Sequence, residues 1–153
     1  MMDEKEQLER QRVVDIAKTY LRTPYHHEGR IRGAGIDCGM LLLNIFEEAG
    51  LIPHLALGVD IPHYPPDWAL HRDDPRYLSW VERYAGKVDR LPLPGDIVLH
   101  QYGRGISHGG LVIEWPLIIH SYRGLGVVYA DAEKEFLDKK SESRQRGIYS
   151  FWG

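Results

Sequence analysis

Cys38 has the residue type and the sequence setting of a nucleophile. It is the single cysteine of the 153-residue chain, so no intramolecular disulfide can form. A lone cysteine with histidines elsewhere in the sequence is a pattern found in cysteine nucleophiles. Asp37, which precedes it, is a residue type that caps helices, and an apolar segment follows. Because the N–H groups of a first helical turn stabilise an anion, we predict a lowered thiol pKa and an enriched thiolate at Cys38.

A second interpretation of Cys38 stays open from this segment alone. At helical spacing the cysteine shares one face with apolar residues, which turns its sulfur toward the interior of the protein. A cysteine on such a face can be a small buried hydrophobe without reactivity. The apolar residues on that face are Leu41, Leu42, Ile45 and Ala49.

His108 and His120 favour the interpretation of Cys38 as a nucleophile over that of a buried hydrophobe. They flank a predicted turn at 114–116, and their midpoint is position 114. In a tight hairpin with that centre the two histidines lie opposite each other on one face, with Cβ atoms about 4.5–5.5 Å apart. A nucleophilic triad needs a base held by a second polar side chain, so we predict that His108 is the base and that His120 orients it. A one-residue slip of register would remove this alignment.

Tyr25 is a fourth candidate, because a Gly-rich loop between it and Cys38 can fold back over the helix start. A phenol there would stabilise a developing oxyanion or contact substrate, together with the backbone N–H of Cys38. The alternative is an aromatic side chain that packs under the loop. The remaining histidines are interpreted as surface or loop residues, with His26 and His27 placed at the groove; they are His26, His27, His54, His63, His71 and His100.

The elements that must position these residues indicate an α+β fold in one domain, 1–153. Apolar residues at helical spacing predict helices, and short runs rich in β-branched and aromatic residues predict a mostly antiparallel sheet in the second half. Residues 25–36 and 52–74 are expected to be loops, and 131–140 a short helix or an excursion. The predicted helices are 3–21, 37–49 and 75–84, and the predicted strands are 96–100, 107–115, 117–121, 125–130 and 146–152.

Charge and hydropathy narrow the possible partners. Nineteen basic and 22 acidic residues give a net charge of -3, which argues against a nucleic-acid partner held by phosphate neutralisation. The N-terminus is charged throughout and lacks the apolar core of a signal peptide. No apolar run approaches the roughly 18 residues of a membrane span. We therefore expect synthesis in the cytoplasm and no membrane partner. If the substrate lies outside the cell, another component must carry the protein there.

Several motifs, in this order, resemble the NlpC-type cell-wall peptidases of papain-like fold. The resemblance covers about 13–128, and the combination of motifs is specific although each alone is not. The segment 63–84 resembles the branch encoded beside phage and prophage tail genes. The motifs are TPY (23–25), GRIRGAGIDC (29–38), PGDIVLH (94–100), SHGGLVI (107–113) and IIHS (118–121).

The resemblance implies a cysteine peptidase that needs no cofactor and cuts peptidoglycan stem peptides. Cys38 would be the nucleophile, His108 the base and His120 the orienting residue, with Tyr25 near the oxyanion. The bond that the family usually cuts joins the γ-carboxyl of D-glutamate to the diamino acid. Asp37 would help to hold a free substrate amine, but many relatives have a serine where this chain has Gly39. The tail-associated branch further implies a protein carried in a phage tail, with other tail proteins as partners.

Two other functions compete with the peptidase. Cys38, His108 and His120 would also suit a zinc-dependent amidase with an open fourth ligand position, although no HExxH or paired-cysteine spacing is present. The other competitor is a catalytically inactive tail-assembly or wall-binding module.

Overall fold

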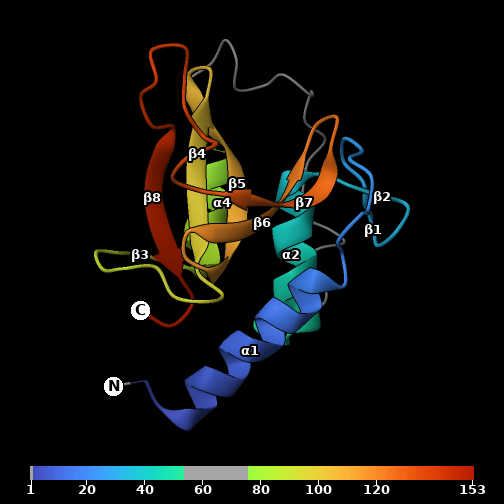
Figure 1. The fold of residues 1–153 in the computed structure, drawn as a ribbon. Coiled ribbons are helices and arrows are strands. Elements are labelled where there is room, and N and C mark those ends of the chain that lie inside the picture. The colour runs from blue at the N-terminus through green and yellow to red at the C-terminus, as the bar shows by residue number, and fades with distance from the viewer. Residues whose placement is uncertain (1, 54–75) are drawn as a thin grey trace.

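The computed structural model describes residues 2–53 and 76–153 and consists of helices packed against an antiparallel sheet (Figure 1). The six-stranded sheet has the order β3-β8-β4-β5-β6-β7, and β1 and β2 form a separate two-stranded ribbon. Every recorded strand pair is antiparallel. The elements are α1 (Glu4–Lys18), β1 (Arg30–Ile31), β2 (Gly35–Ile36), α2 (Cys38–Glu48), α4 (Arg76–Tyr84), β3 (Gly86–Val88), β4 (Ile97–Tyr102), β5 (Gly105–Glu114), β6 (Leu117–Tyr122), β7 (Gly126–Asp131) and β8 (Gln145–Ser150).

The predicted α+β class is confirmed, and so is the helix that begins at the cysteine. Asp37 caps α2, with its side chain accepting a hydrogen bond from the N–H of Met40 at 2.9 Å, and Ala49 is the C-cap. Asp3 caps α1 in the same way, through the N–H of Glu6. The helix α1 ends at Lys18, earlier than predicted, because turns with i→i+3 backbone hydrogen bonds replace it there.

Other expectations need correction. The predicted loop 25–36 contains the ribbon β1–β2, and β3 was not predicted at all, since strands of two or three residues carry no readable alternation. Of the two expectations for segment 131–140, a short helix or an excursion, the excursion is confirmed: the segment is rich in turns, holds no helix and buries Phe136. Most of the predicted loop 52–74 lies outside the described residues. In the described part of the chain, no helix is long and apolar enough to cross a membrane.

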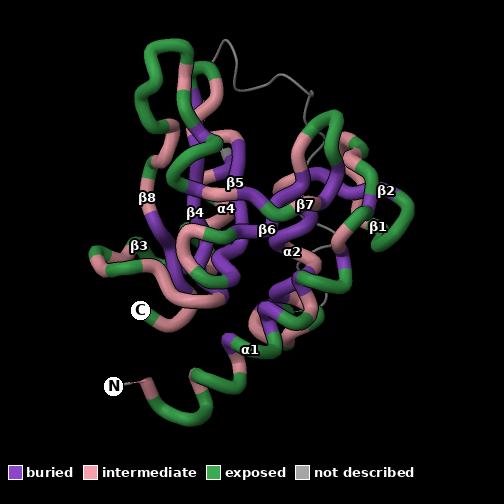
Figure 2. The backbone as a smooth tube through the Cα atoms, viewed as in Figure 1, coloured by how far each residue is buried: buried purple, intermediate pink, exposed green. Residues whose placement is uncertain are grey.

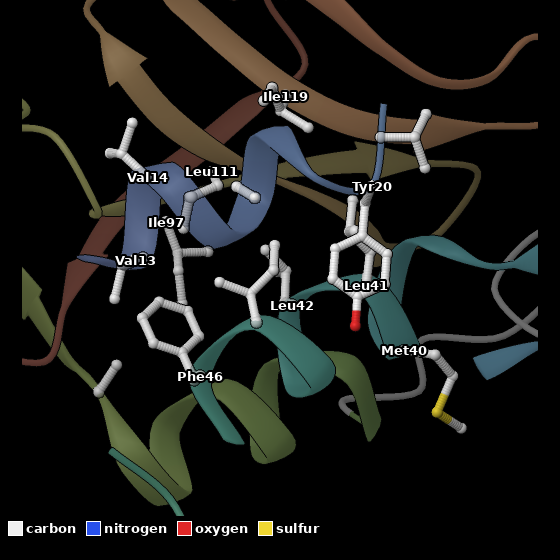
Figure 3. Close-up of a cluster of buried hydrophobic side chains, with 14 of the residues drawn as sticks. Val13, Val14, Tyr20, Met40, Leu41, Leu42, Phe46, Ile97, Leu111 and Ile119 are labelled. Carbon is white, nitrogen blue, oxygen red and sulfur yellow. The ribbon is translucent and has the colours of Figure 1, made fainter. Parts of the chain in front are cut away.

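The main core lies between the helices and one face of the sheet. The helices α1, α2 and α4 all contact β5, the strand that also carries His108 (Figure 1). Purple buried segments run along β4, β5, β6 and the inner side of α2 in Figure 2. The close-up in Figure 3 shows side chains from α1, α2 and the sheet meeting in this core, among them Val13, Leu41, Leu42, Phe46, Ile97 and Leu111.

A buried ion pair fastens α1 to the start of β4. Arg10 is 2% exposed and donates to Asp96, which is fully buried, at 2.9 Å, and to the carbonyl oxygen of Pro94 at 2.8 Å. Arg90 donates to the second Asp96 oxygen at 2.7 Å. Burial alone would raise the pKa of Asp96, but the hydrogen bonds from Arg90, the Leu93 N–H and Arg10 outweigh it and lower that pKa. The carboxylate therefore stays ionised inside the protein.

We predict that Arg10→Met lowers the free energy of unfolding by about 3 kcal/mol, because it removes one partner of a buried ion pair and keeps the aliphatic stem. Arg12→Met, on the exposed side of the same helix, is the matched control and should stay within about 0.5 kcal/mol of wild type. Urea unfolding measures both. Equal losses in the two variants would mean that the buried pair adds nothing.

Candidate active site

Asp37 fixes the position of Cys38 at the first turn of α2. One oxygen of its carboxylate caps the helix, and the other accepts a hydrogen bond from the N–H of Glu28 at 2.9 Å. The side chain is buried, at 3% exposure, and so ties the preceding loop to the helix start. Both oxygens are thus engaged with backbone N–H groups. The structure places Asp37 beside Cys38 as the helix cap, whereas Cys38 itself is only partly buried.

The sulfur of Cys38 lies against β5. Its thiol donates a hydrogen bond to the carbonyl oxygen of Ser107 at 3.5 Å, so the sulfur sits beside the backbone at His108. The recorded pairing of β5 with β6 runs from Leu111 to Glu114. The sulfur therefore contacts β5 at Ser107, before the residues of β5 that pair with β6.

His108 and His120 form a direct hydrogen bond. Nε2 of His108 lies 2.8 Å from Nδ1 of His120, and the two rings are nearly perpendicular, at 83°. Both side chains are buried, at 6% and 4% exposure. If Nε2 of His108 carries the proton and donates it to His120, Nδ1 of His108 keeps its lone pair. That is the tautomer that a base acting on a thiol requires.

The predicted contact is present, but the predicted register is wrong. Leu111 pairs with Ile119, and continuing this register places Gly110 opposite His120. β5 extends to Glu114 with a bulge after Val112, so the turn is shorter than predicted and the pairing shifts by two positions. A shift of two keeps both histidines on one face, and they meet as a diagonal pair. A Cβ atom on Gly110 would lie 2.7 Å from Ile118 Cδ1 and 3.5 Å from the Cβ of His120, so a glycine leaves the room for this approach.

Aromatic side chains enclose the imidazole of His108. Tyr102 and Tyr122 present edges to it at centroid distances of 5.9 and 5.7 Å, and Phe136 lies at 5.9 Å. Phe136 comes from the excursion after β7, which was not expected to reach the site. The ring of His108 is therefore held in a largely apolar surrounding.

His100 was interpreted as a surface residue, and that interpretation is wrong. It is fully buried on β4, pairs across the ladder with His108, and stacks on Phe136 at 3.9 Å. Neither ring nitrogen has a hydrogen-bond partner among the described residues. Of the other histidines, His26 is exposed and bonds the carbonyl oxygen of His27 at 2.9 Å. His54, His63 and His71 lie outside the described residues.

Burial sets the protonation of the site. It lowers the pKa of His108 well below 6.5, that of His120 to about 4 and that of His100 to about 3. Burial and then the Asp37 carboxylate raise the pKa of Cys38 to about 12. The prediction of a lowered thiol pKa is thus wrong, because desolvation and a neighbouring negative charge outweigh the helix start. At rest the site holds a neutral thiol and neutral imidazoles.

Tyr25 lies in the electrostatic neighbourhood of the sulfur. It is half-buried and forms an isolated bridge with Ile36, just before the start of α2. Ser121 on β6 donates to the carbonyl oxygen of Ile36 at 2.7 Å, which holds this loop against the strand of His120. Burial and then the electrostatic interaction with the neighbouring Cys38 raise the pKa of Tyr25 to about 12, so its phenol stays protonated.

Tyr77 is a residue at the site that was not predicted from the sequence. It is 4% exposed on α4, and its hydroxyl donates to the backbone oxygen of Cys38 at 3.4 Å. The segment 75–84 was predicted as a helix, but nothing in its spacing indicates which residue meets α2. A small apolar cavity of about 30 Å³ lies beside it, and its lining includes Gly39, Leu42, Phe46, Trp80 and Tyr84.

The geometry does not favour the zinc alternative. The two facing imidazole nitrogens of His108 and His120 are occupied by each other at 2.8 Å and do not converge on a common point. Within residues 2–53 and 76–153, no group of three His, Cys, Asp or Glu side chains is arranged to hold a metal ion.

A sequence profile described as the NlpC/P60 family matches residues 22–146 of the chain, which include the cysteine and both site histidines. The chain belongs to the NlpC/P60 family. Members of this family are generally peptidoglycan hydrolases of the cysteine peptidase type. No curated protein sequence matches the chain.

Solved NlpC/P60 structures share the fold. The NlpC/p60 domain of the peptidoglycan hydrolase SagA has a TM-score of 0.60 at 17% identity, with 92% of this chain and 97% of that chain covered. An NlpC/P60 family protein from Bacillus cereus has a TM-score of 0.63 at 19% identity, with 94% and 40% covered. NlpC1 from Trichomonas vaginalis has a TM-score of 0.59 at 18% identity, with 98% and 47% covered. The chain thus spans less than half of the latter two proteins.

The buried neutral histidines predict a loss of stability in acid. In the unfolded chain a histidine has a pKa of about 6.5, whereas folding lowers it, so the unfolded state binds more protons between these values. The contribution of these histidines to the free energy of unfolding is complete above about pH 6.5. It is lost as the pH falls toward 4, by up to about 1.4 kcal/mol per pH unit for each histidine. His100→Leu removes one such group, so the free energy of unfolding of this variant should fall less steeply with decreasing pH than that of wild type. Urea unfolding at pH 4.5 to 8 measures this, and parallel curves for the two proteins would contradict it.

Proposed function

We propose that this chain is a cysteine endopeptidase that hydrolyses amide bonds in the stem peptides of peptidoglycan. The observation that carries the proposal is the 2.8 Å hydrogen bond between His108 and His120. His108 lies on β5, the strand that the Cys38 sulfur contacts at Ser107. A nucleophile, a base and a group that orients the base are the parts that such a reaction requires. Membership of the NlpC/P60 family supports the same reaction class.

The first step follows from the neutral resting state. As the sulfur of Cys38 attacks the carbonyl carbon, the thiol proton passes to Nδ1 of His108, and the imidazolium keeps its Nε2–H bond to His120. The carbonyl oxygen becomes an oxyanion, which the N–H groups at the start of α2 and the protonated phenol of Tyr25 stabilise. Asp37 acts through the position of Cys38, because its carboxylate caps the helix.

The second half of the reaction returns the proton. His108 protonates the leaving amine, the C–N bond breaks, and a thioester on Cys38 remains. His108 then takes a proton from water, which attacks the thioester and releases the carboxylate product and the thiol. No cofactor is needed, since water is the only co-reactant.

We further propose the scissile bond and the setting. The bond is that between the γ-carboxyl of D-glutamate and the diamino acid, as the family resemblance implies. The resemblance of segment 63–84 to tail-associated relatives supports a protein carried in a phage tail that opens the wall locally, with other tail proteins as partners. Most of that segment lies outside the described residues, so this setting rests on sequence alone.

We predict that Cys38→Ala abolishes digestion of purified peptidoglycan, while His120→Ala keeps part of it. In a serine triad, removing the orienting residue lowers kcat about a hundredfold less than removing the nucleophile does, because the base still reaches the nucleophile. Mass spectrometry of the released muropeptides measures the rate and identifies the bond. Glu114→Ala, exposed on the same hairpin, is the control and should digest like wild type.

Digestion by Cys38→Ala at the wild-type rate would exclude the mechanism. A folded wild-type protein that binds peptidoglycan and releases no muropeptide would instead favour the inactive wall-binding module. Products cut at another bond would leave the mechanism intact and correct only the scissile bond.

A further inference from the structure

Arg144 lies where the chain returns from the excursion after β7 to β8, next to the last residues of β4 (Figure 1). Its guanidinium carbon is 4.4 Å from the centre of the Tyr102 ring, and Tyr102 is one of the aromatic side chains around His108. Its backbone N–H donates to the carbonyl oxygen of Phe136 at 2.8 Å, and the Phe136 ring also lies against His108. Arg144 therefore contacts two of the residues that enclose the proposed base.

The guanidinium is held in place by backbone acceptors and is not neutralised by a carboxylate. Nη1 donates to the carbonyl oxygen of Gln101 at 3.2 Å, and Nε donates to that of Leu137 at 3.4 Å. Among residues 2–53 and 76–153, Nη2 has no hydrogen-bond partner, and no Asp or Glu forms an ion pair with Arg144. Asp138 lies close enough for this charge to act on it, but its carboxylate accepts from backbone N–H groups of its own turn.

This cation suits a carboxylate ligand. A guanidinium presents its N–H donors in a planar fork that matches the two oxygens of a carboxylate. Arg144 is half-buried and stacked on Tyr102, so its fork is already ordered before a ligand arrives. A group that is ordered in advance loses less side-chain entropy on binding than a freely moving surface arginine does.

The place of Arg144 indicates which half of a substrate it would meet. In the proposed mechanism Tyr25 and the start of α2 stabilise the oxyanion, whereas His108 protonates the leaving amine. The leaving half of the substrate is therefore the half next to His108. Because Arg144 contacts the side chains that enclose His108, a charge in the leaving half is the one within its reach.

We propose that Arg144 is a specificity-determining residue that binds a carboxylate in the leaving half of the substrate. It would favour stem peptides in which the released diamino acid keeps its free carboxylates over those in which these groups are amidated. The inference rests on the proposed function, which locates the scissile bond at Cys38. Arg144 takes no part in the bond changes, so its removal should raise KM and leave kcat near the wild-type value.

Two synthetic tripeptides test this recognition of charge. One is L-alanyl-γ-D-glutamyl-diaminopimelate, and the other has both diaminopimelate carboxylates converted to carboxamides. Wild type should cut the carboxylate peptide with a kcat/KM at least about tenfold higher, because hydrogen bonds to charged groups are stronger than those to neutral ones. Arg144→Met should lose this preference through a higher KM for the carboxylate peptide, and it should cut the carboxamide peptide like wild type.

Arg146→Met is the matched control, since it removes the same charge two positions away. Its guanidinium is already engaged with side-chain and backbone oxygens, so this variant should keep the wild-type preference. If Arg144→Met proves unfolded, Arg144→Lys replaces it; this variant keeps the charge, loses the fork and should show a smaller preference. Equal kcat/KM of wild type for the two peptides, or an unchanged preference in the folded Arg144 variant, would overturn the proposal.

Binding measured without hydrolysis separates this inference from the proposed function. Isothermal titration of Cys38→Ala with each uncut tripeptide should show at least about tenfold tighter binding of the carboxylate form, and adding Arg144→Met should remove the difference. If wild type cuts neither peptide but this binding preference is present, the proposed function is wrong and the carboxylate site stands. Equal binding of the two peptides, or binding of neither, would overturn the carboxylate site.

Discussion

The hydrogen bond between His108 and His120 depends on a hairpin in which a glycine, Gly110, faces His120 across the two strands. A side chain at this position would collide with Ile118. Because the two imidazoles are buried, each also needs the other as a partner for a ring nitrogen, since an unpaired buried polar group is costly. The hairpin, the glycine and the imidazole pair thus form one arrangement, and the base of the proposed reaction exists only within it.

The α2 helix packs against this hairpin, and several contacts between residues far apart in the sequence fix its position. Asp37 connects the helix start to the loop before it, and Ser121 on β6 holds that loop at Ile36. At the opposite end of the core, Arg10 and Asp96 fasten α1 to β4. Since α1, α2 and α4 all contact β5, small displacements of any of them would move the sulfur relative to His108. The precision of the site therefore comes from the whole core.

The sequence was sufficient for features that depend on local signals. The capped start of α2 and the main strands follow from residue types within a few positions, and they were predicted correctly. The face shared by His108 and His120 was also predictable, because side chains alternate with period two and a shift of two positions preserves the face. The register was not, since it depends on a bulge and on the length of the turn.

Features that depend on burial or on distant contacts were missed for a physical reason. His100 lies on a strand that is buried on both faces, so polar and apolar positions do not alternate there and its depth could not be read. The pKa of Cys38 was predicted in the wrong direction because desolvation is a property of the packed protein. Tyr77 meets Cys38 across 39 positions of sequence, and no local pattern encodes that contact.

The same burial that keeps the thiol neutral can also make the site effective once substrate is bound. A neutral thiol is a poor target for alkylation and oxidation, which protects the single cysteine of the chain at rest. If a peptide covers the partly exposed Cys38, as the proposed function requires, the surrounding donors would act in a medium of lower effective dielectric, where each stabilises charge more strongly than in water. In the proposed mechanism the thiolate would then form mainly during attack on a bound carbonyl, which would link reactivity to substrate occupancy. A neutral thiol in an apolar surrounding would thus resist modification until substrate is bound, whereas a permanently ionised pair of thiolate and imidazolium would not.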